Sequence, residues 1–203
     1  MRRGAIRYGG ALGLGLLLGI GSALYLAGLW PGTKPLDFGD VDIGGWRSDF
    51  AIGSLAADPY TRARVARHGL LALAKSEAVY FTKATDDAGR PLTEECTYRL
   101  SGRAMPAQWW SITLYTAESL LPLNTDAALS IDQSSVGKAA AGWQAIVAPE
   151  RPEAAEHWIS SRNAGSFDLM LRLYVPDATL LADPQTVLEP PRIERLGCEG
   201  KGP

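Results

Sequence analysis

Residues 167–176 have the sequence FDLMLRLYVP, in which apolar residues alternate with mostly polar ones. Successive side chains of a strand point to opposite sides of a sheet, so this alternation predicts a strand with one packed face and one mixed face. Val175-Pro176 ends the strand, because proline cannot donate to the hydrogen-bond ladder. The packed face comprises Phe167, Leu169, Leu171, Leu173 and Val175, and the mixed face comprises Asp168, Met170, Arg172 and Tyr174.

Further strands are predicted on the amino-terminal side of this stretch. Residues 109–116 are rich in the aromatic and β-branched residues that sheets favour, and Asp86-Asp87-Ala88-Gly89 has the composition of a hairpin turn. Short strands punctuated by glycine and proline predict an all-β fold, a β-sandwich or jelly-roll-like domain. The predicted strands are Glu77–Lys83, Cys96–Leu100, Trp109–Thr116, Ala127–Asp132 and Trp143–Val147.

One amphipathic helix is expected to flank this sandwich. Asp58 suits an N-cap and Pro59 suits the first helical position, and apolar residues then recur on one helix side from Tyr60 to about Ser76. The preceding Thr33–Gly53 is rich in Gly and Asp, which predicts a stalk with little regular structure. The expected domains are a transmembrane anchor at residues 1–31, a stalk at 32–57 and the β-sandwich at 58–203.

The first 30 residues have the charge and hydropathy of a membrane anchor. Arg2, Arg3 and Arg7 precede the uncharged stretch Tyr8–Trp30. Its roughly 20 apolar residues would span a bilayer core at about 1.5 Å per residue. Basic residues before the span and none just after it predict an amino terminus in the cytoplasm. We therefore expect a single-pass protein of the cytoplasmic (inner) membrane with its main domain in the periplasm.

A cleaved secretory signal peptide is the alternative, with Gly21-Ser22-Ala23 as its cleavage site. We favour the anchor because the apolar region of a signal usually has only about 7–15 residues. Small residues recur at every fourth position of the span and include Gly15, Gly19 and Ala23, which predicts a packing stripe for self-association. Glycine and alanine are also simply frequent in transmembrane helices, which would explain the same pattern.

Charge and cysteine content constrain the part beyond the anchor. Three of the 20 basic residues precede the span and all 22 acidic residues follow residue 36, so the remainder has a net charge of −5. That charge argues against nucleic acid as a partner. The two cysteines are Cys96 and Cys198, and an oxidising compartment would permit a disulfide between them. Two separate thiols are the alternative.

No motif identifies a reaction. A G-x-S-x-G elbow is absent, and Gly137-Lys138 lacks the upstream glycine of a P-loop. His68 and His157 each lack a neighbouring second metal ligand. We therefore expect no catalytic residues, no cofactor and no metal site, and we treat the protein as non-enzymatic.

A binding surface is the chemistry that the residues suggest most. Trp109 and Tyr115 share one face of their predicted strand, and Arg172 and Tyr174 share the mixed face of theirs. Aromatic rings with polar tips suit a half-exposed site, so these four residues are a candidate ligand face for a sugar or a lipid headgroup. The same residue types are also good sheet formers that pack under loops.

Four motifs, at residues 109–115, 157–159, 167–176 and 190–193, have the sequences WWSITLY, HWI, FDLMLRLYVP and PPRI. Together they resemble the family called domain of unknown function 1214 over most of Glu77–Cys198, and the LRLYxP element is the most specific part. Many members have Asn-Trp-Leu-Pro where this chain has His157-Trp158-Ile159-Ser160. A role tied to that asparagine or proline therefore does not transfer.

The resemblance implies an all-β sandwich without established activity. Longer members carry a second domain, domain of unknown function 1254, for which this chain has no room. We expect a separate membrane-tethered protein to supply it and this chain to act as an interaction module. The alternative is a carbohydrate-binding or glycan-processing jelly roll. A cleft joining Trp109 to a carboxylate would favour the alternative, and a broad exposed apolar patch would favour the module. The candidate carboxylates are Glu118, Asp126, Asp132 and Asp168.

Overall fold

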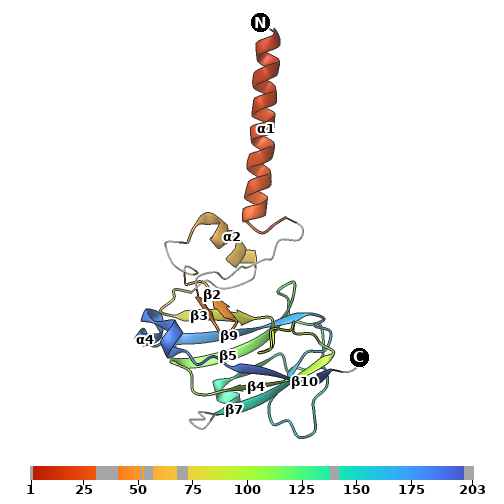
Figure 1. Cartoon of the computed structure of the whole chain (residues 1–203), viewed down its shortest axis with the longest axis vertical. Helices are drawn as coiled ribbons and strands as arrows, with labels where there is room; N and C mark the ends of the chain where they lie inside the picture. Colours follow the sequence, from red (N-terminus) through yellow and green to blue (C-terminus); the bar gives the residue numbers. More distant parts are fainter. Residues whose placement is uncertain are drawn as a thin grey trace. The chain divides into compact units, whose positions relative to one another are not determined.

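The structure is a computed structural model that describes residues 2–30, 41–50, 52, 57–67, 73–137 and 142–198. It divides into two compact units. One is formed by Met1–Asp37 with Leu55–Ala72, and the other by Phe38–Ser54 with Leu73–Pro203. All strands of the described residues belong to the second unit (Figure 1).

The first unit contains helices α1 (Arg2–Leu26) and α2 (Pro59–Arg67). No helix of the described residues combines the length and hydropathy needed to cross a membrane, so the transmembrane part of the expected fold is not supported. Gly15 and Gly19 leave open space beside α1, since a Cβ at either position would meet no atom within 4 Å. Self-association through the stripe that also includes Ala23 stays a prediction.

Helix α2 begins where the sequence predicts. Asp58 Oδ1 accepts hydrogen bonds from the backbone amides of Tyr60 (2.8 Å) and Thr61 (3.2 Å), which caps the first turn. The predicted end near Ser76 is wrong, because residues 75–77 form a turn instead. This turn leads directly into the first long strand of the second unit.

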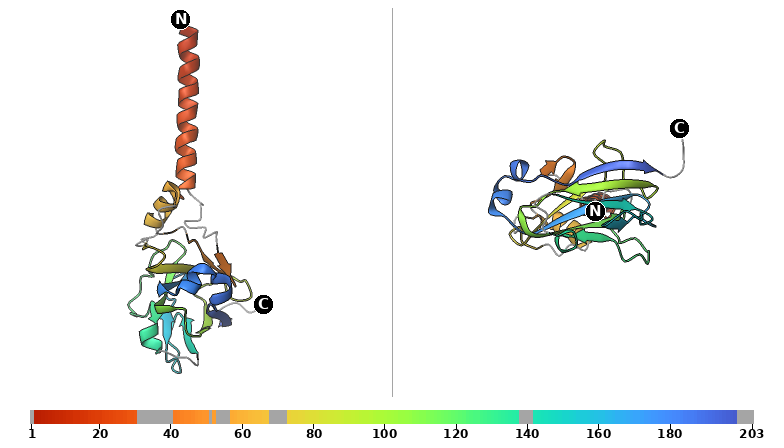
Figure 2. Two further views of the ribbon diagram at one scale, coloured as in Figure 1. Left: turned by 90° about the vertical axis from the view of Figure 1, so that its left-hand side faces the viewer. Right: turned by 90° about the horizontal axis from the view of Figure 1, so that it is seen from below.

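Two sheets form the second unit. The strands are β1 (Val41–Ile43), β2 (Trp46–Ser48), β3 (Ala78–Lys83), β4 (Cys96–Gly102), β5 (Ala107–Thr116), β6 (Ser130–Asp132), β7 (Trp143–Ala148), β8 (Trp158–Ser160), β9 (Phe167–Pro176) and β10 (Arg192–Cys198). One sheet has the order β1-β2-β3-β9-β5-β6 and the other the order β10-β4-β7-β8. Strands β7 and β8 are parallel. Figure 2 shows the dark blue β10 beside β4, with which it pairs antiparallel.

Strand β9 lies between β3 and β5 at the centre of the six-stranded sheet. Its residues Leu169, Leu171 and Leu173 are fully buried, as the alternation predicts. The two sheets pack face to face, since Trp110 of β5 stacks on Trp143 of β7 with ring centroids 4.7 Å apart. A mostly β fold with two sheets is therefore confirmed.

The region predicted as an irregular stalk contains a hairpin, which corrects that expectation. Strands β1 and β2 are joined by Gly44 and Gly45, both with positive φ, and the Gly45 amide donates to Asp42 Oδ1 (2.9 Å). A two-residue turn with φ above zero at both positions suits a hairpin and favours glycine. The hairpin is held by the buried Trp46, whose Nε1 donates to the Pro191 carbonyl (2.8 Å).

Three further differences concern the second unit. It has short helices α3 (Gln133–Val136), α4 (Ala178–Ala182) and α5 (Pro184–Val187), so a single flanking helix was too few. Strands β8 and β10 were not predicted. Val175 was expected on the packed face, but it is 46% exposed. Its φ of 47° interrupts the extended conformation, and the alternation of faces ends there.

Candidate functional site

The four residues of the predicted ligand face come together on the side of the six-stranded sheet that faces away from the core. Trp109 pairs with Tyr174 across β5 and β9, and their ring centroids are 5.2 Å apart. The Arg172 guanidinium donates to the Tyr115 hydroxyl and lies 5.5 Å from the centroid of that ring. The use of this face by a ligand stays a prediction.

The polar groups of this face mostly satisfy one another. Arg172 also donates to Thr113 Oγ1 (3.3 Å), and Trp109 Nε1 donates to Ser134 Oγ (3.0 Å). Donors bonded within the protein are less free to recognise a ligand. None of these four residues lines the cleft beside the four-stranded sheet.

Asp168 lies on the same face and pairs with Tyr115 in the β5–β9 ladder. Its Oδ1 is buried and accepts no hydrogen bond from a described residue. Burial disfavours the charged form and raises the pKa of this carboxyl group to about 7. Asp168 therefore changes its protonation state near neutral pH.

Two other candidate carboxylates serve local structure. Asp126 Oδ2 accepts a hydrogen bond from Ser160 Oγ (2.6 Å) and forms an ion pair with Arg162 Nε (3.2 Å). Asp132 caps the amino terminus of α3. Both side chains thus already have polar partners within the protein.

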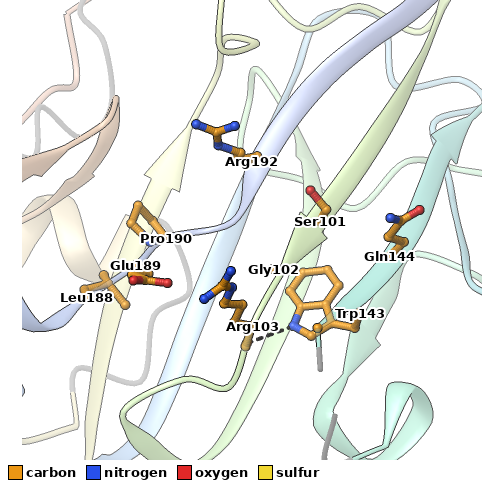
Figure 3. Close-up of a pocket in the computed structure, with 10 residues that line it drawn as sticks. Ser101, Gly102, Arg103, Trp143, Gln144, Leu188, Glu189, Pro190 and Arg192 are labelled. Carbon is orange, nitrogen blue, oxygen red and sulfur yellow. Dashed lines mark hydrogen bonds between the residues drawn. The ribbon is translucent and has the colours of Figure 1, made fainter. Parts of the chain in front are cut away.

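A cleft of about 890 Å³ opens beside the four-stranded sheet (Figure 3). Its lining comes from the end of β4, the start of β7, the start of β10 and residues 188–190, which precede β10. The volume falls within the range of about 300–1,000 Å³ that is usual for small-molecule sites. The sequence did not single out this cleft.

Trp143 forms one wall of the cleft and is held on two sides. Its ring stacks on Trp110 of the opposite sheet, and its Nε1 donates to the Arg103 carbonyl (3.1 Å). Gly102 allows the close approach, because a Cβ there would lie 2.5 Å from Cζ2 of the Trp143 ring. Such packing leaves the wall little freedom to move.

Arg103, Glu189 and Arg192 supply the charges of the cleft. All three side chains are exposed, and none forms an ion pair or a hydrogen bond with a described residue. Arg192 lies opposite Ser101 in the β10–β4 ladder, and Ser101 lies opposite Gln144 in the β4–β7 ladder. Directly paired residues present their side chains on the same face of a sheet. The cleft therefore offers guanidinium, hydroxyl and amide groups in one row.

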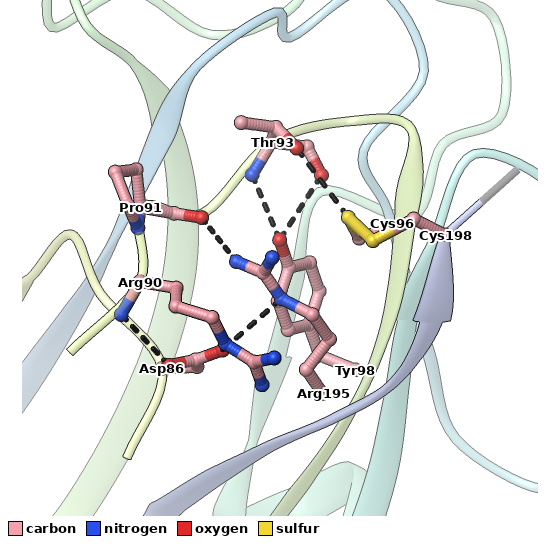
Figure 4. Close-up of a disulfide and its surroundings, with 8 residues drawn as sticks. All are labelled: Asp86, Arg90, Pro91, Thr93, Cys96, Tyr98, Arg195 and Cys198. Atoms are coloured by element: carbon pink, nitrogen blue, oxygen red, sulfur yellow. Dashed lines mark hydrogen bonds and ion pairs between the residues drawn. A yellow bond between two sulfur atoms is a disulfide. The ribbon is translucent and has the colours of Figure 1, made fainter. Parts of the chain in front are cut away.

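The far end of β10 is fixed by the predicted disulfide. Cys198 lies opposite Cys96 of β4, and the two are joined (Figure 4). Next to them, Arg195 forms an ion pair with the buried Asp86 (3.0 Å) and lies 5.4 Å from the centroid of the Tyr98 ring. These contacts hold the ladder that carries Arg192 at its other end.

Burial by itself would raise the pKa of Asp86, but its hydrogen bonds and nearby cations outweigh this effect and lower the pKa. The Arg90 backbone amide donates to Oδ1 (2.9 Å), and Arg90 Nε donates to Oδ2 (2.8 Å). Arg195 adds its charge. Asp86 is therefore charged in the folded protein at neutral pH and joins the β3–β4 turn to β10.

An apolar loop follows β5, and we call residues 117–124 the leucine loop. Leu120, Leu121 and Leu123 are 65%, 50% and 90% exposed. Glu118 is exposed in the same loop. Exposed leucines are common singly, but three within four residues form a patch of the kind that marks interaction sites.

The leucine loop is held in place by hydrogen bonds at both ends. The Thr116 amide donates to the Leu120 carbonyl (2.8 Å), and Asn163 Nδ2 donates to the Leu123 carbonyl (2.7 Å). Asn124 Nδ2 donates to the Arg162 carbonyl (2.9 Å). The loop thus presents its leucines from a fixed backbone. Three leucines in four residues between two strands were a signal for this site that the sequence analysis missed.

The sequence model of a family described as "Protein of unknown function (DUF1214)" matches residues 77–178. No curated protein matches the chain. The match covers β3 to β9, including both strands of the predicted ligand face and the leucine loop.

Two solved structures are similar to the chain. The VPA0106 protein from Vibrio parahaemolyticus has a TM-score of 0.54 and 18% identity, and the match covers 70% of this chain and 36% of that one. A putative uncharacterized protein from Burkholderia cenocepacia has a TM-score of 0.46 and 15% identity, with coverages of 76% and 35%. The first likeness concerns the fold alone. The chain spans about a third of the length of each structure.

Proposed function

Because this chain belongs to the DUF1214 family of proteins of unknown function, we propose its role from its surface: a non-enzymatic interaction module that docks a second protein domain. The exposed leucine loop is the observation that carries this proposal. Burial of a leucine side chain contributes about 1.5–3 kcal/mol, so two or three of them could anchor an interface. A loop already fixed by hydrogen bonds loses little conformational entropy on binding.

The partner in this proposal is a separate membrane-tethered protein that carries the domain of unknown function 1254. Its docking surface would be an apolar groove that receives Leu120 and Leu123. The likeness to the Vibrio protein supports such a pairing, because there the fold occupies about a third of a longer chain. The present fold therefore occurs elsewhere next to further polypeptide.

Co-purification tests the docking role. The tagged full chain is isolated from its native cells, and a protein in constant ratio to it is expected. The double variant Leu120→Ser/Leu123→Ser should lose that protein. Leu196→Ser, which changes an exposed leucine of β10 outside the loop, should retain it. Absence of any such protein, or its retention by the double variant when circular dichroism shows an intact fold, would contradict the proposal.

We also propose that the second unit works in the periplasm, tethered to the inner membrane. The basic and then apolar start of the chain supports this location, as does the Cys96–Cys198 disulfide, because disulfides persist in oxidising compartments. Cell fractionation tests it. Protein found in the cytoplasm, or found in soluble periplasmic extract without its first 30 residues, would refute the tethered arrangement.

A further inference from the structure

We propose that the cleft beside β4, β7 and β10 binds a small anionic ligand that also carries hydroxyl groups, such as a sugar with a carboxylate or a phosphate. This activity goes beyond the docking role. The leucine loop follows the carboxyl end of β5, whereas Arg103 precedes its amino end, so the two sites use different surfaces.

Arginines without a polar partner line this cleft. Arg103 and Arg192 make no ion pair or side-chain hydrogen bond with a described residue, and both line the cleft. The other described arginines of the second unit all have a polar partner: Arg47, Arg90, Arg99, Arg151, Arg162, Arg172 and Arg195. Among the described residues of the second unit, the two arginines without a polar partner thus both line this cleft, in a chain whose net charge is −2.

Guanidinium groups recognise anionic oxygens particularly well. The planar fork of an arginine donates two parallel hydrogen bonds to a carboxylate or a phosphate. Arg103 follows the end of β4 and Arg192 begins β10, and because these strands are antiparallel neighbours both arginines lie at the same end of the sheet. The anionic group of the ligand is therefore assigned to these two side chains.

The row of paired residues supplies groups for hydroxyl recognition. Ser101 and Gln144 follow Arg192 across three adjacent strands, which lie about 4.8 Å apart. A hydroxyl and an amide at this spacing can donate and accept hydrogen bonds along a sugar-sized ligand. Trp143, the neighbour of Gln144 in β7, is fixed by its stacking on Trp110, which holds the start of this strand in place.

Glu189 weakens the attraction of the cleft for anions. Its exposed carboxylate lines the same cleft and can accept hydrogen bonds from hydroxyl groups, but it repels negative charge on a ligand. Removal of this charge by Glu189→Gln should therefore strengthen the binding of an anion. A role for Glu189 in stability alone would not produce that change.

Titration calorimetry on the full chain tests the site with three probes: trigalacturonate, its neutral counterpart galactotriose, and glucose 6-phosphate. We expect at least one anionic probe to bind and galactotriose to bind at least tenfold more weakly. Arg103→Gln and Arg192→Gln should each weaken binding at least fivefold. Arg99→Gln is the matched control, because it removes a positive charge from the same sheet at a residue already paired with Glu194. It should change affinity less than twofold.

Each outcome decides the proposal. Binding of trigalacturonate alone would identify a carboxylate as the anionic group of the ligand, and binding of glucose 6-phosphate alone would identify a phosphate. Binding of neither anion, equal binding of galactotriose, or equal losses for Arg99→Gln and Arg103→Gln would overturn it. The double variant Leu120→Ser/Leu123→Ser should bind the probe as the wild type does, so this result is separate from the docking test.

Discussion

Replacement of Asp168 by asparagine tests the electrostatics of the predicted ligand face. The pKa of Asp168 is about 7 in the folded protein because its carboxyl group is buried, compared with an ordinary value of 3.8. At pH values between 3.8 and about 7, the Asp168 carboxyl group is ionised in the unfolded chain and protonated in the folded chain. The folded state is therefore favoured below pH 3.8, and this advantage disappears as the pH rises towards 7.

The magnitude follows from the difference between the two pKa values. Each unit corresponds to about 1.4 kcal/mol, so the ionisation of Asp168 reduces the free energy of unfolding by up to about 4 kcal/mol at pH 8. Asparagine has nearly the same shape and does not ionise. Asp168→Asn should then be more stable than the wild type by about 1–4 kcal/mol at pH 8. The range extends below about 4 kcal/mol because the buried amide would take the place of Oδ1, which has no hydrogen-bond partner, and this offsets part of the gain. At pH 4 the two proteins should differ little.

Urea unfolding of the full chain at several pH values between 4 and 8 measures this difference. The control is Asp177→Asn, which changes an exposed aspartate that makes no side-chain cap hydrogen bond. This control should show no gain in stability over the wild type at pH 8. If the difference in free energy of unfolding between Asp168→Asn and the wild type stays constant with pH, or narrows as the pH rises, the prediction is refuted.

Three further variants test the packing of Gly102 and the contacts at the carboxyl end of β10. Gly102→Ala should lower the free energy of unfolding by about 1–3 kcal/mol, because the added Cβ would clash with the Trp143 ring. Gly197→Ala is the control, since a Cβ there meets no atom within 4 Å, and thermal unfolding compares the two variants. Cys96→Ser with Cys198→Ser should cost about 2–4 kcal/mol in urea, and a reductant should then have no further effect. Asp86→Asn should reduce the free energy of unfolding by up to about 3 kcal/mol at pH 7. The reduction should be smaller in acid, because the pKa of Asp86 is lowered in the folded protein and its contribution to stability disappears once it is protonated; urea denaturation at pH 3 and pH 7 measures this.

Local patterns were sufficient to predict the two longest strands, β5 and β9. The alternation in residues 167–176 depends only on which side of one strand each residue occupies, and a buried sheet enforces it. The predicted face of Trp109, Tyr115, Arg172 and Tyr174 formed because β5 and β9 happen to be neighbours. The Gly44-Gly45 pair was a hairpin signal within the supposed stalk, and its neglect is the reason that β1 and β2 were missed.

The cleft could not be predicted because its charges are brought together by pairing between distant segments. Arg103 and Arg192 are far apart in sequence, and they meet only because β10 pairs with β4. The register is specific to that pairing, and a shift by one residue would turn Arg192 to the other face. No periodicity within either segment contains this information.

The β10–β4 ladder also links the disulfide to the proposed anion site. Cys198 pairs with Cys96 at one end of this ladder, and Arg192 pairs with Ser101 at the other. If the cystine keeps β10 in register, the double variant Cys96→Ser/Cys198→Ser should weaken binding of an anionic probe without touching the cleft. Calorimetry well below the unfolding temperature measures this effect. Unchanged affinity would mean that the hydrogen bonds of the ladder, together with the contacts of Asp86 and Arg195, fix Arg192 on their own.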